Sequence, residues 1–499
     1  MNRIFFIISL LILWGCQQKN KNIATITFQI DMSEVIDDIT DPETIGIVGS
    51  GPLEWRRIAM QDIGEGVYSV TFEWPAENPD TMIYTFMHSY DIFDDSNIGV
   101  AAYRTLIVTP GIKNLPIVKW GEVKANTGLA TPSPMLKVEQ SDTEAEKKAL
   151  SVPFYGVTTD GDLIPDLYSI NATGISTAGI KKAVEDFLNS LSIEQREMCT
   201  FPIDNKEWRR WSNIDSYKRK GIGLPDLTEK QKELAFRILE ESLSTKGFQK
   251  TQDIMKMEGY LAQLANEFEM LGSDRYWFTF MGIPSDTQPW GWQIDGHHLV
   301  INYFILGDQI VMTPTFMGSE PNYIAEGENA GTRTFENEEK LGLTFYHSLD
   351  HEQRKTATLL DRKDYNYNQA ASFDDNAIVP YSGLNVTALN ETQMNMLEEL
   401  ISEYVGNMKE GHDKVRMDEI LEHMDHTYFA WIGGRDKNDA FYYRIQSPVV
   451  LIEFDHQIPV FLAGSKPSKK HVHTIVRTPN GNDYGKDLLR QHLKEDHHH

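Results

Sequence analysis

Two histidines, His471 and His473, stand two residues apart in the β-rich stretch HVHTIVRTP near the end of the chain. In a strand, alternate side chains share a face and lie roughly 7 Å apart, so both imidazoles can reach one cation. Arg477 falls on the same face. The following turn, TPNGNDYG, places Asp483 near the start of a helix, where an anionic ligand is favoured. The segment therefore predicts a metal site or an anion-binding site.

An acidic pair interrupts the apolar stretch VVLIEFDH, which is predicted to be a strand. Glu453 and Asp455 would share one face of this strand. A buried carboxylate costs several kcal/mol unless a cation or a metal ion compensates it. Two interpretations therefore stay open: ligation of a metal, or salt bridges to Arg444 and Arg477.

A third cluster, the sequence DGHH, follows the aromatic stretch WGWQI. Adjacent strand residues point to opposite faces, so only one of His297 and His298 should enter a shared site. Gly296 permits a bulge that would relax this rule. We expect one histidine to be a ligand and the other to support it, with Trp290 and Trp292 as walls of the pocket.

Together, the three clusters predict one site that holds a divalent transition metal. Zinc is the first expectation, and copper, iron and manganese use the same ligand types. The expected ligands are His471, His473, Glu453, and His297 or His298. Asp455 would orient a ligand or act as a base, Arg444 and Arg477 would clamp an anionic group, and Asp483 would contact substrate.

The reaction class stays open. Zinc would favour hydrolysis of an anionic or carbohydrate-related substrate, whereas copper or iron would favour oxidation. The sequence has no G-x-S-x-G, H-E-x-x-H, phosphate-binding loop or C-x-x-C motif that would point to another chemistry. The remaining alternative is a polar pocket without metal in a non-catalytic protein that binds a glycan or another ligand.

The elements that must position these residues fall into two regions. Residues 24–120 contain short β-rich runs separated by turn residues, which predicts a small all-β sandwich. Residues 121–150 are polar and predict a linker with a helical end. Residues 151–496 alternate helical stretches with β-rich blocks at 289–316 and 429–464, which predicts an α+β domain with an antiparallel sheet covered by helices.

One helix-start pattern occurs four times in the second region. A leucine precedes Ser, Thr, Asp or Asn, and Gln follows three positions later, which is a capping box. The four pairs are Ser192 and Gln195, Thr228 and Gln231, Asp350 and Gln353, and Asn390 and Gln393. The repetition is compatible with a distant duplication, although shared caps can also arise without one.

The N-terminal residues predict a targeting signal. Residues 1–15 contain Arg3 and an apolar run too short to span a bilayer, typical of a signal peptide. The end of this run, LWGC, resembles the lipobox of bacterial lipoproteins, which implies cleavage before Cys16 and acylation of its sulfur. Residues 16–23 would form a tether. We therefore expect a lipid anchor in the cell envelope. We exclude His497–His499 from the site, because three terminal histidines could be a tag remnant.

The charge of the chain limits the classes of partner that we expect. The 499-residue chain has a formal net charge of −26, so its surface repels phosphate backbones and nucleic acid is not an expected partner. A small-molecule or glycan substrate is expected instead. The sequence has two cysteines, Cys16 and Cys199. If the sulfur of Cys16 is acylated, Cys199 has no disulfide partner within the chain.

Several long motifs resemble a known family. WGWQIDGHHL, TPTFMGSEP, FAWIGG, FYYRIQSPVVLIEFDHQ and the C-terminal HVHTIVRTPNGNDYGKDLLRQH resemble the domain-of-unknown-function family numbered 3500, over about Phe154–His492. The resemblance implies a common fold but no activity. It supports a site composed of His297, His298, Glu453, Asp455, His471, His473, Arg477 and Asp483. Residues 24–120 separately resemble starch-binding and early-set immunoglobulin-like modules.

Overall fold

The computed structural model describes residues 144–496, apart from 463 and 465, together with parts of 23–120. Those parts are residues 23–33, 35–36, 39, 42, 45–49, 58–75, 80–88, 92–93, 104–108 and 111–120. Cys16 and the predicted signal peptide lie outside the described residues. The chain divides into two compact units, Met1–Lys137 and Val138–His499. Each unit has a hydrophobic core of its own.

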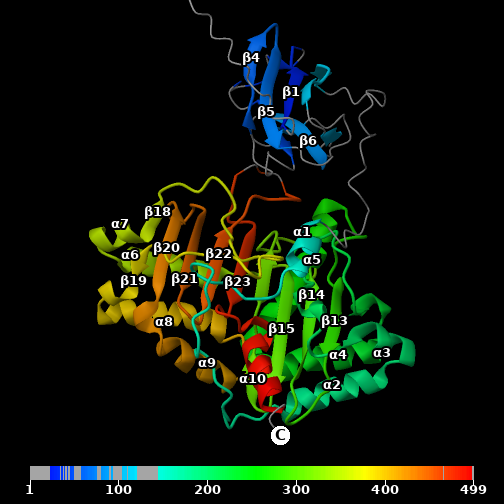
Figure 1. Cartoon of the computed structure of the whole chain (residues 1–499), viewed down its shortest axis with the longest axis vertical. Helices are drawn as coiled ribbons and strands as arrows, with labels where there is room; N and C mark the ends of the chain where they lie inside the picture. The colour runs from blue at the N-terminus through cyan, green and yellow to red at the C-terminus, as the bar shows by residue number, and fades with distance from the viewer. Residues whose placement is uncertain are drawn as a thin grey trace, which may run out of the picture. The chain divides into compact units, whose positions relative to one another are not determined.

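The N-terminal unit is rich in strands and contains two sheets (Figure 1). The first has the order β10-β1-β5-β4, with β9 also on β1, and the second has the order β3-β2-β6-β7, with β8 also on β6. Alternate residues of β1 are buried, from Ala24 to Ile30. Phe28 of the first sheet packs edge-to-face on Tyr84 of the second, with ring centroids 4.8 Å apart. The two sheets therefore share one core.

The strands of this unit have the following bounds: β1 Ile23–Asp31, β2 Gly46–Gly49, β3 Ile58–Ala59, β4 Gln61–Gly64, β5 Val67–Pro75, β6 Asp80–His88, β7 Ile92–Phe93, β8 Arg104–Val108, β9 Gly111–Asn114 and β10 Val118–Lys119.

The C-terminal unit is built on one large sheet with the order β11-β13-β14-β15-β17-β23-β22-β21-β20-β18. Three short strands pair beside this path: β12 on β13, β16 on β15, and β19 on β20. The bounds are β11 Thr200–Phe201, β12 Ile222–Gly223, β13 Tyr276–Met281, β14 Trp290–Gly296, β15 Leu299–Leu306, β16 Gln309–Val311, β17 Thr315–Ser319, β18 Thr358–Leu360, β19 Leu384–Asn385, β20 Tyr428–Gly433, β21 Phe441–Gln446, β22 Leu451–His456 and β23 Val472–Arg477.

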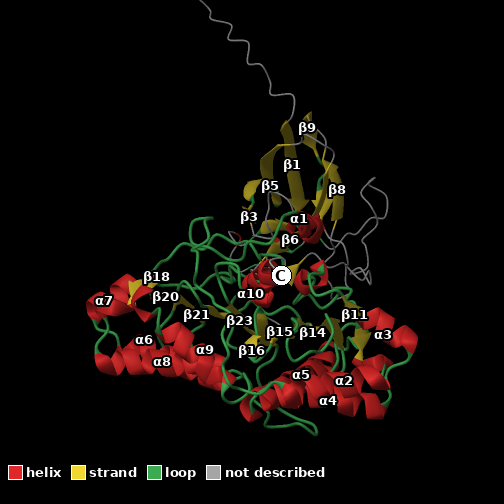
Figure 2. Cartoon of the chain, turned by 60° about the horizontal axis from the view of Figure 1, so that its bottom comes forward, coloured by secondary structure: helices red, strands yellow, loops and turns green. Residues whose placement is uncertain are grey.

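Every neighbouring pair along the path from β13 to β20 is antiparallel. All residues of β14 and β15 are buried, because both faces of the sheet are covered. Figure 2 shows α2, α4, α5, α6, α8 and α9 on one side of the sheet and α10 on the other. An α+β fold with a helix-covered antiparallel sheet, preceded by a strand-rich region, is therefore confirmed.

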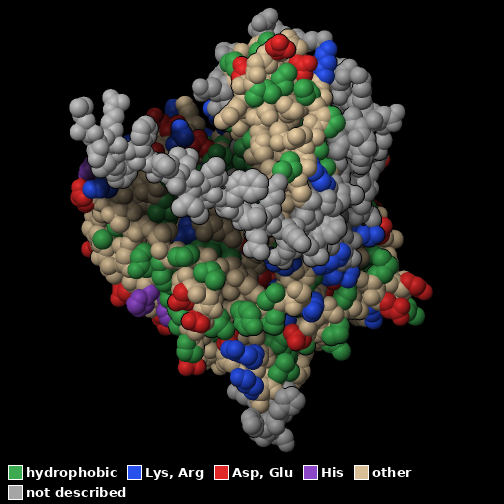
Figure 3. All heavy atoms as spheres, turned by 45° about the horizontal axis from the view of Figure 1, so that its top comes forward, with side chains coloured by type: hydrophobic (Ala, Val, Ile, Leu, Met, Phe, Trp, Pro, Cys, Tyr) green, Lys and Arg blue, Asp and Glu red, His purple; other side chains and the backbone are tan. Residues whose placement is uncertain are grey.

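The helices have these bounds: α1 Glu144–Ser151, α2 Ala178–Ser190, α3 Ile193–Cys199, α4 Glu229–Ser242, α5 Thr245–Ala265, α6 Glu336–Ser348, α7 His351–Ala357, α8 Glu391–Val405, α9 His412–Leu421 and α10 Lys486–Asp496. Among the described residues, no helix is both long enough and apolar enough to span a bilayer. Helix α1 belongs to the C-terminal unit, and its carbonyls at Ala149 and Leu150 accept hydrogen bonds from Arg209 and Lys206 of the same unit. On the face seen in Figure 3, acidic and basic side chains lie among one another.

All four predicted capping boxes are present, at the starts of α3, α4, α7 and α8. They also form two matching pairs. Gln231 donates to the Ser190 carbonyl at 2.9 Å and to Gln195 at 3.2 Å. In the second half, Gln393 donates to the Ser348 carbonyl and to Gln353, both at 2.8 Å. The caps therefore also join neighbouring helices to one another.

The order of elements repeats as well. The series α2, α3, β11, β12, α4, α5, β13, β14, β15, β17 is matched by α6, α7, β18, β19, α8, α9, β20, β21, β22, β23. In each half the first short strand is parallel to its neighbour and the second is antiparallel. The halves meet where β17 pairs with β23, seen in Figure 1 as red β23 beside the green strands. Within the C-terminal unit, the described elements other than α1, β16 and α10 thus form two repeats joined edge to edge, which favours the duplication that the caps left open.

Candidate metal centre

His471 and His473 share a face of the sheet at the beginning of β23. Their rings lie 4.5 Å apart between centroids, and the two Nε2 atoms are 2.9 Å apart. Both side chains are buried. Thr474 and Val476 point to the opposite, helix-covered face, because strand residues alternate.

His298 joins this pair from the start of β15. The backbone N–H of Gly318 on β17 donates to the His298 carbonyl at 2.8 Å, and this bond fixes the backbone position. The His298 ring centroid is 5.6 Å from those of both His471 and His473. A Cβ atom at Gly318 would lie 2.9 Å from the His473 ring and 3.0 Å from the His298 ring, so glycine leaves the room that the rings need. One nitrogen of each histidine lies within 4.8 Å of the others.

Hydrogen bonds set the protonation of two of these rings. His298 Nδ1 donates to the Glu258 carboxylate at 2.7 Å, and His471 Nδ1 donates to the Ile458 carbonyl at 2.8 Å. Since both acceptors lack a proton, Nδ1 carries the hydrogen in each ring and a neutral ring leaves a lone pair on Nε2. His298 Nε2 is buried and has no hydrogen-bond partner. An unpaired buried acceptor is costly, so this atom is available to a ligand.

The surroundings keep the three imidazoles neutral. Burial lowers the pKa of His298 to about 4, with the charge of His297 acting in the same direction. Burial also lowers the pKa of His471 and of His473 well below the ordinary histidine value, and the neighbouring histidines add to the shift. Neutral imidazole is the form that binds metal ions.

Glu258 on α5 connects His298 to His297. Its two carboxylate oxygens accept from His297 Nδ1 at 2.6 Å and from His298 Nδ1 at 2.7 Å. Burial disfavours the charged forms of both His297 and Glu258. The charge of Glu258 and its hydrogen bond nevertheless raise the pKa of His297 above its ordinary value. The two histidines in turn hold the pKa of Glu258 below its ordinary value. The two rings stack with centroids 3.8 Å apart. His297 is therefore not a member of the three-histidine group. It belongs to a second group of potential ligands, which consists of Glu258, His297 and His298.

Glu320 supports the site from the end of β17. Its buried carboxylate accepts the backbone N–H groups of Val460, Phe461 and Leu462 at 2.9–3.1 Å. This segment also supplies the Ile458 carbonyl that binds His471. Burial raises the pKa of Glu320, and these backbone N–H donors oppose that rise. Glu320 therefore anchors the segment that orients His471.

The sequence interpretation missed Glu258 and Glu320. Glu258 had a usable signal, because it falls in the buried stripe of α5 that includes Ile254, Leu261 and Ala262. A carboxylate at helical spacing within such a stripe needs a buried cationic or hydrogen-bonding partner. Glu320 stands in a turn after the strand, and no periodic pattern marks it.

The acidic pair of β22 is bound by another part of the chain. Glu453 accepts from the Tyr442 hydroxyl at 2.7 Å and from the backbone N–H groups of Gln369 and Ala370. Asp455 forms an ion pair with Lys363 at 2.6 Å and accepts from the Tyr367 N–H at 2.7 Å.

Asp455 pairs in register with His473, but neither carboxylate belongs to the two groups of potential ligands among the described residues. The geometry thus gives no support to Glu453 as a metal ligand, and both carboxylates anchor the segment 363–370.

The predicted clamp residues also have internal partners. Arg477 is fully buried and donates to Asp375 at 2.8 Å and to Asp483 at 3.2 Å. Asp483 additionally accepts from the Thr478 N–H at 2.7 Å. Arg444 donates to the Pro380 carbonyl and the Ser382 hydroxyl. The structure therefore places Arg477, Asp483 and Arg444 in networks that join the sheet to the loops covering it.

Trp290 and Trp292 lie in the core between the sheet and the helices. The Trp290 indole donates to the Ser285 carbonyl at 2.9 Å, and Trp292 stacks on Tyr303 at 5.1 Å between centroids. Their strand, β14, continues into the turn that carries His297 and His298. The two tryptophans and the three-histidine group do not form a common wall, because the tryptophans pack on the opposite side of the sheet.

Three neutral imidazole nitrogens, on rings of which two are oriented by hydrogen bonds, are a donor set for zinc, copper, nickel or iron. In His298 and His471, Nδ1 is bonded to a carboxylate or a carbonyl and Nε2 keeps its lone pair. Histidines that bind metal ions have the same arrangement. The alternative without metal is a hydrogen bond between His471 and His473, which would satisfy those two rings. It would leave His298 Nε2 unpaired, so the residues fit a metal ion better.

A family model described as "Protein of unknown function (DUF3500)" matches residues 173–486. The comparison with curated proteins and the comparison with solved structures each gave no significant match.

Proposed function

Since the chain belongs to the DUF3500 family, whose description names no activity, we propose its function from the geometry alone. The protein is a metal-dependent hydrolase, and His298, His471 and His473 hold a divalent ion, with zinc as the preferred metal. The observation that carries the proposal is the convergence of three imidazole nitrogens, one of which is buried without a partner.

The protein side of the chemistry follows from the partners of each ring. Glu258 holds the proton on His298 Nδ1, and the Ile458 carbonyl holds the proton on His471 Nδ1. Both rings therefore present Nε2 to the ion without reorienting, and the carboxylate increases the basicity of His298. A bound zinc ion supplies a Lewis acid and activates water near neutral pH. Three protein ligands leave a fourth position for water or substrate.

Imidazole ligands suit zinc, copper and iron alike, and we prefer zinc because it is the metal that would supply the proposed hydrolysis. Copper or iron at the same nitrogens would make an oxidoreductase. The identity of the metal in protein from its native source therefore decides between the two reaction classes. The substrate, expected from the sequence to be anionic or carbohydrate-related, remains part of the proposal.

Elemental analysis of protein purified without a histidine tag tests the metal. We expect about one zinc per chain in the wild type and loss of that zinc in His298→Ala and His473→Ala. The matched control is His456→Ala, because His456 is buried in the same sheet but bonds to Phe441 and Glu339 instead. Circular dichroism of each variant verifies folding. A wild type without metal that gains no thermal stability from added zinc, copper, iron or manganese would contradict the proposal.

A separate assay tests the reaction. Wild-type protein should hydrolyse p-nitrophenyl esters of acetate or phosphate, or p-nitrophenyl glycosides, and a chelator should abolish the activity until zinc is restored. Metal binding without hydrolysis of any of these compounds would retain the metal centre and reject the hydrolase assignment for these substrate classes.

A further inference from the structure

A second site lies on the opposite side of the sheet from the three histidines. A cavity of about 320 Å³ is bounded by the central strands and by helices α5, α8 and α9. Its floor includes Thr315 of β17, Thr474 and Val476 of β23, and Thr478 directly after β23. Thr474 and Val476 alternate with His473, so the sheet separates the cavity from the candidate metal centre. The cavity thus lies where the two repeats meet.

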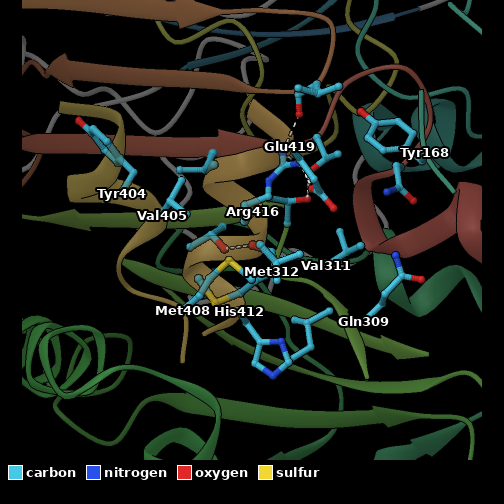
Figure 4. A pocket seen from close by; sticks show the side chains of 18 of the residues that line it. Tyr168, Gln309, Val311, Met312, Tyr404, Val405, Met408, His412, Arg416 and Glu419 are labelled. Atoms are coloured by element: carbon cyan, nitrogen blue, oxygen red, sulfur yellow. Dashed lines mark hydrogen bonds and ion pairs between the residues drawn. The ribbon is translucent and has the colours of Figure 1, made fainter. Parts of the chain in front are cut away.

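One face of α9 forms a wall of this cavity. His412, Val415, Arg416 and Glu419 are spaced at i, i+3, i+4 and i+7 and all line it. Figure 4 shows His412, Arg416 and Glu419 of α9 around the pocket, together with Val311 at the end of β16 and the following Met312. The spacing explains how one short helix brings polar and apolar groups to the same space.

Part of the lining of this cavity is apolar. Met312, Met317 and Met408 line it together with Val405 and Val476. Methionine side chains are flexible and polarizable, so they adapt to ligands of irregular shape. A volume of about 320 Å³ is within the range for sites that bind small organic molecules.

The lysine and arginine side chains on the walls already have partners, and the carboxylates of Asp166 and Glu422 belong to exposed residues. Arg416 donates to Glu419 at 2.8 Å and also to the Val449 carbonyl at 2.6 Å. Lys250 forms an ion pair with Glu338. A charged ligand would have to displace one of these partners and lose its own hydration, which is costly at a buried site. The walls therefore favour a ligand without net charge.

Two polar groups on the walls lack partners. His412 Nε2 and Asn407 Oδ1 are buried and make no hydrogen bond. Both side chains are less than a tenth exposed, at 3% and 4% respectively. Unpaired buried polar atoms cost about 1–3 kcal/mol each, and a ligand hydroxyl or amide that reached either atom would remove that cost.

We propose that this cavity binds a neutral amphipathic molecule, with an apolar body among the methionines and a hydroxyl or amide group at His412 or Asn407. The proposal is independent of the metal, because no cavity-lining residue is a member of the two metal-binding groups. Binding at the junction of the repeats would stabilise the β17–β23 pairing that joins them.

Isothermal titration calorimetry with 1-octanol, octanoate and octylammonium tests the ligand class, because the three probes share one chain length and differ in charge. We expect saturable one-to-one binding of 1-octanol and at least tenfold weaker binding of both ions. Tighter binding of either ion would overturn the assignment of a neutral ligand. No saturable binding of 1-octanol would overturn the site.

Two filling substitutions test the location. Val476→Phe and Val415→Phe place a ring in the cavity from the strand and from the helix, and each should weaken 1-octanol binding at least tenfold. The control is Ile283→Phe, at a residue that is 81% exposed and lies outside this cavity. Circular dichroism shows which variants fold, and the comparison of probes on the wild type does not depend on them. Unchanged binding in a folded filling variant would place the 1-octanol site elsewhere and overturn the proposal.

Discussion

At the scale of single residues, the proposed metal centre depends on which nitrogen of each ring carries the proton. His298 illustrates this, since Glu258 occupies Nδ1 and leaves Nε2 to the ion. Glu258 does not touch the proposed ion, so we regard it as a positioning residue. Its contribution is orientation, tautomer selection and added basicity of the ring.

Glu258→Gln should therefore lower zinc affinity about 10- to 100-fold without removing a ligand. The amide keeps one acceptor oxygen but loses the charge that attracts the two histidine protons. Competition with a chromogenic chelator measures the affinity. Asp253→Asn, at a carboxylate on the same helix that pairs with Lys256, is the control and should leave the affinity unchanged. Equal affinities in the two variants would contradict the role given to Glu258.

At the scale of elements, the buried Glu320 side chain ties residues 460–462 of the segment 458–462 to the end of β17. Glu320 accepts three consecutive backbone N–H groups, and the same segment supplies the carbonyl that orients His471. Hydrogen bonds to a charged acceptor contribute more than neutral ones. The anchoring of the segment and the orientation of a proposed ligand are therefore coupled.

Glu320→Gln should reduce the free energy of unfolding by about 1–3 kcal/mol, because an amide oxygen accepts fewer and weaker hydrogen bonds than a carboxylate. Amide hydrogen exchange at 460–462 should accelerate in the same variant. Urea denaturation and exchange mass spectrometry measure the two effects. Glu326→Gln, at an exposed position of the same loop region, should change neither. Slow exchange at 460–462 in Glu320→Gln would show that another contact holds the segment.

At the scale of the whole molecule, we propose that the two units are carried on a lipid anchor in a bacterial cell envelope. The support is sequence alone: an apolar run before Cys16 that resembles a lipobox. Cys16 lies outside the described residues. A single acyl chain binds membranes weakly, whereas several chains on one residue anchor a protein stably.

Cys16→Ser should abolish incorporation of labelled fatty acid and move the protein from the membrane fraction to the soluble fraction. Cys199→Ser is the control, because Cys199 is buried in the core and burial raises the pKa of its thiol to about 12, so it is not a reactive group. Membrane fractionation and labelling measure the outcome. Retention of Cys16→Ser in the membrane fraction would reject the anchor.

Features that depend on local pattern were predictable from the sequence. The four capping boxes, the alternation of β23 and the helix-covered antiparallel sheet follow from residue spacing, because caps and strand faces are fixed by neighbours a few positions away. His471 and His473 share a face for the same reason. The sequence also indicated that Glu453 and Asp455 need buried partners, which they have.

The identity of those partners depended on the tertiary structure. Lys363 and the segment 367–370 cover the acidic pair, Asp375 neutralises Arg477, and Glu258 reaches His297 and His298 from a helix about forty positions earlier in the chain. No periodic pattern encodes such pairings, because a buried charge can be compensated by any loop or helix that the fold brings to it. The sequence alone determined which groups need a partner, and the tertiary structure decided which groups meet.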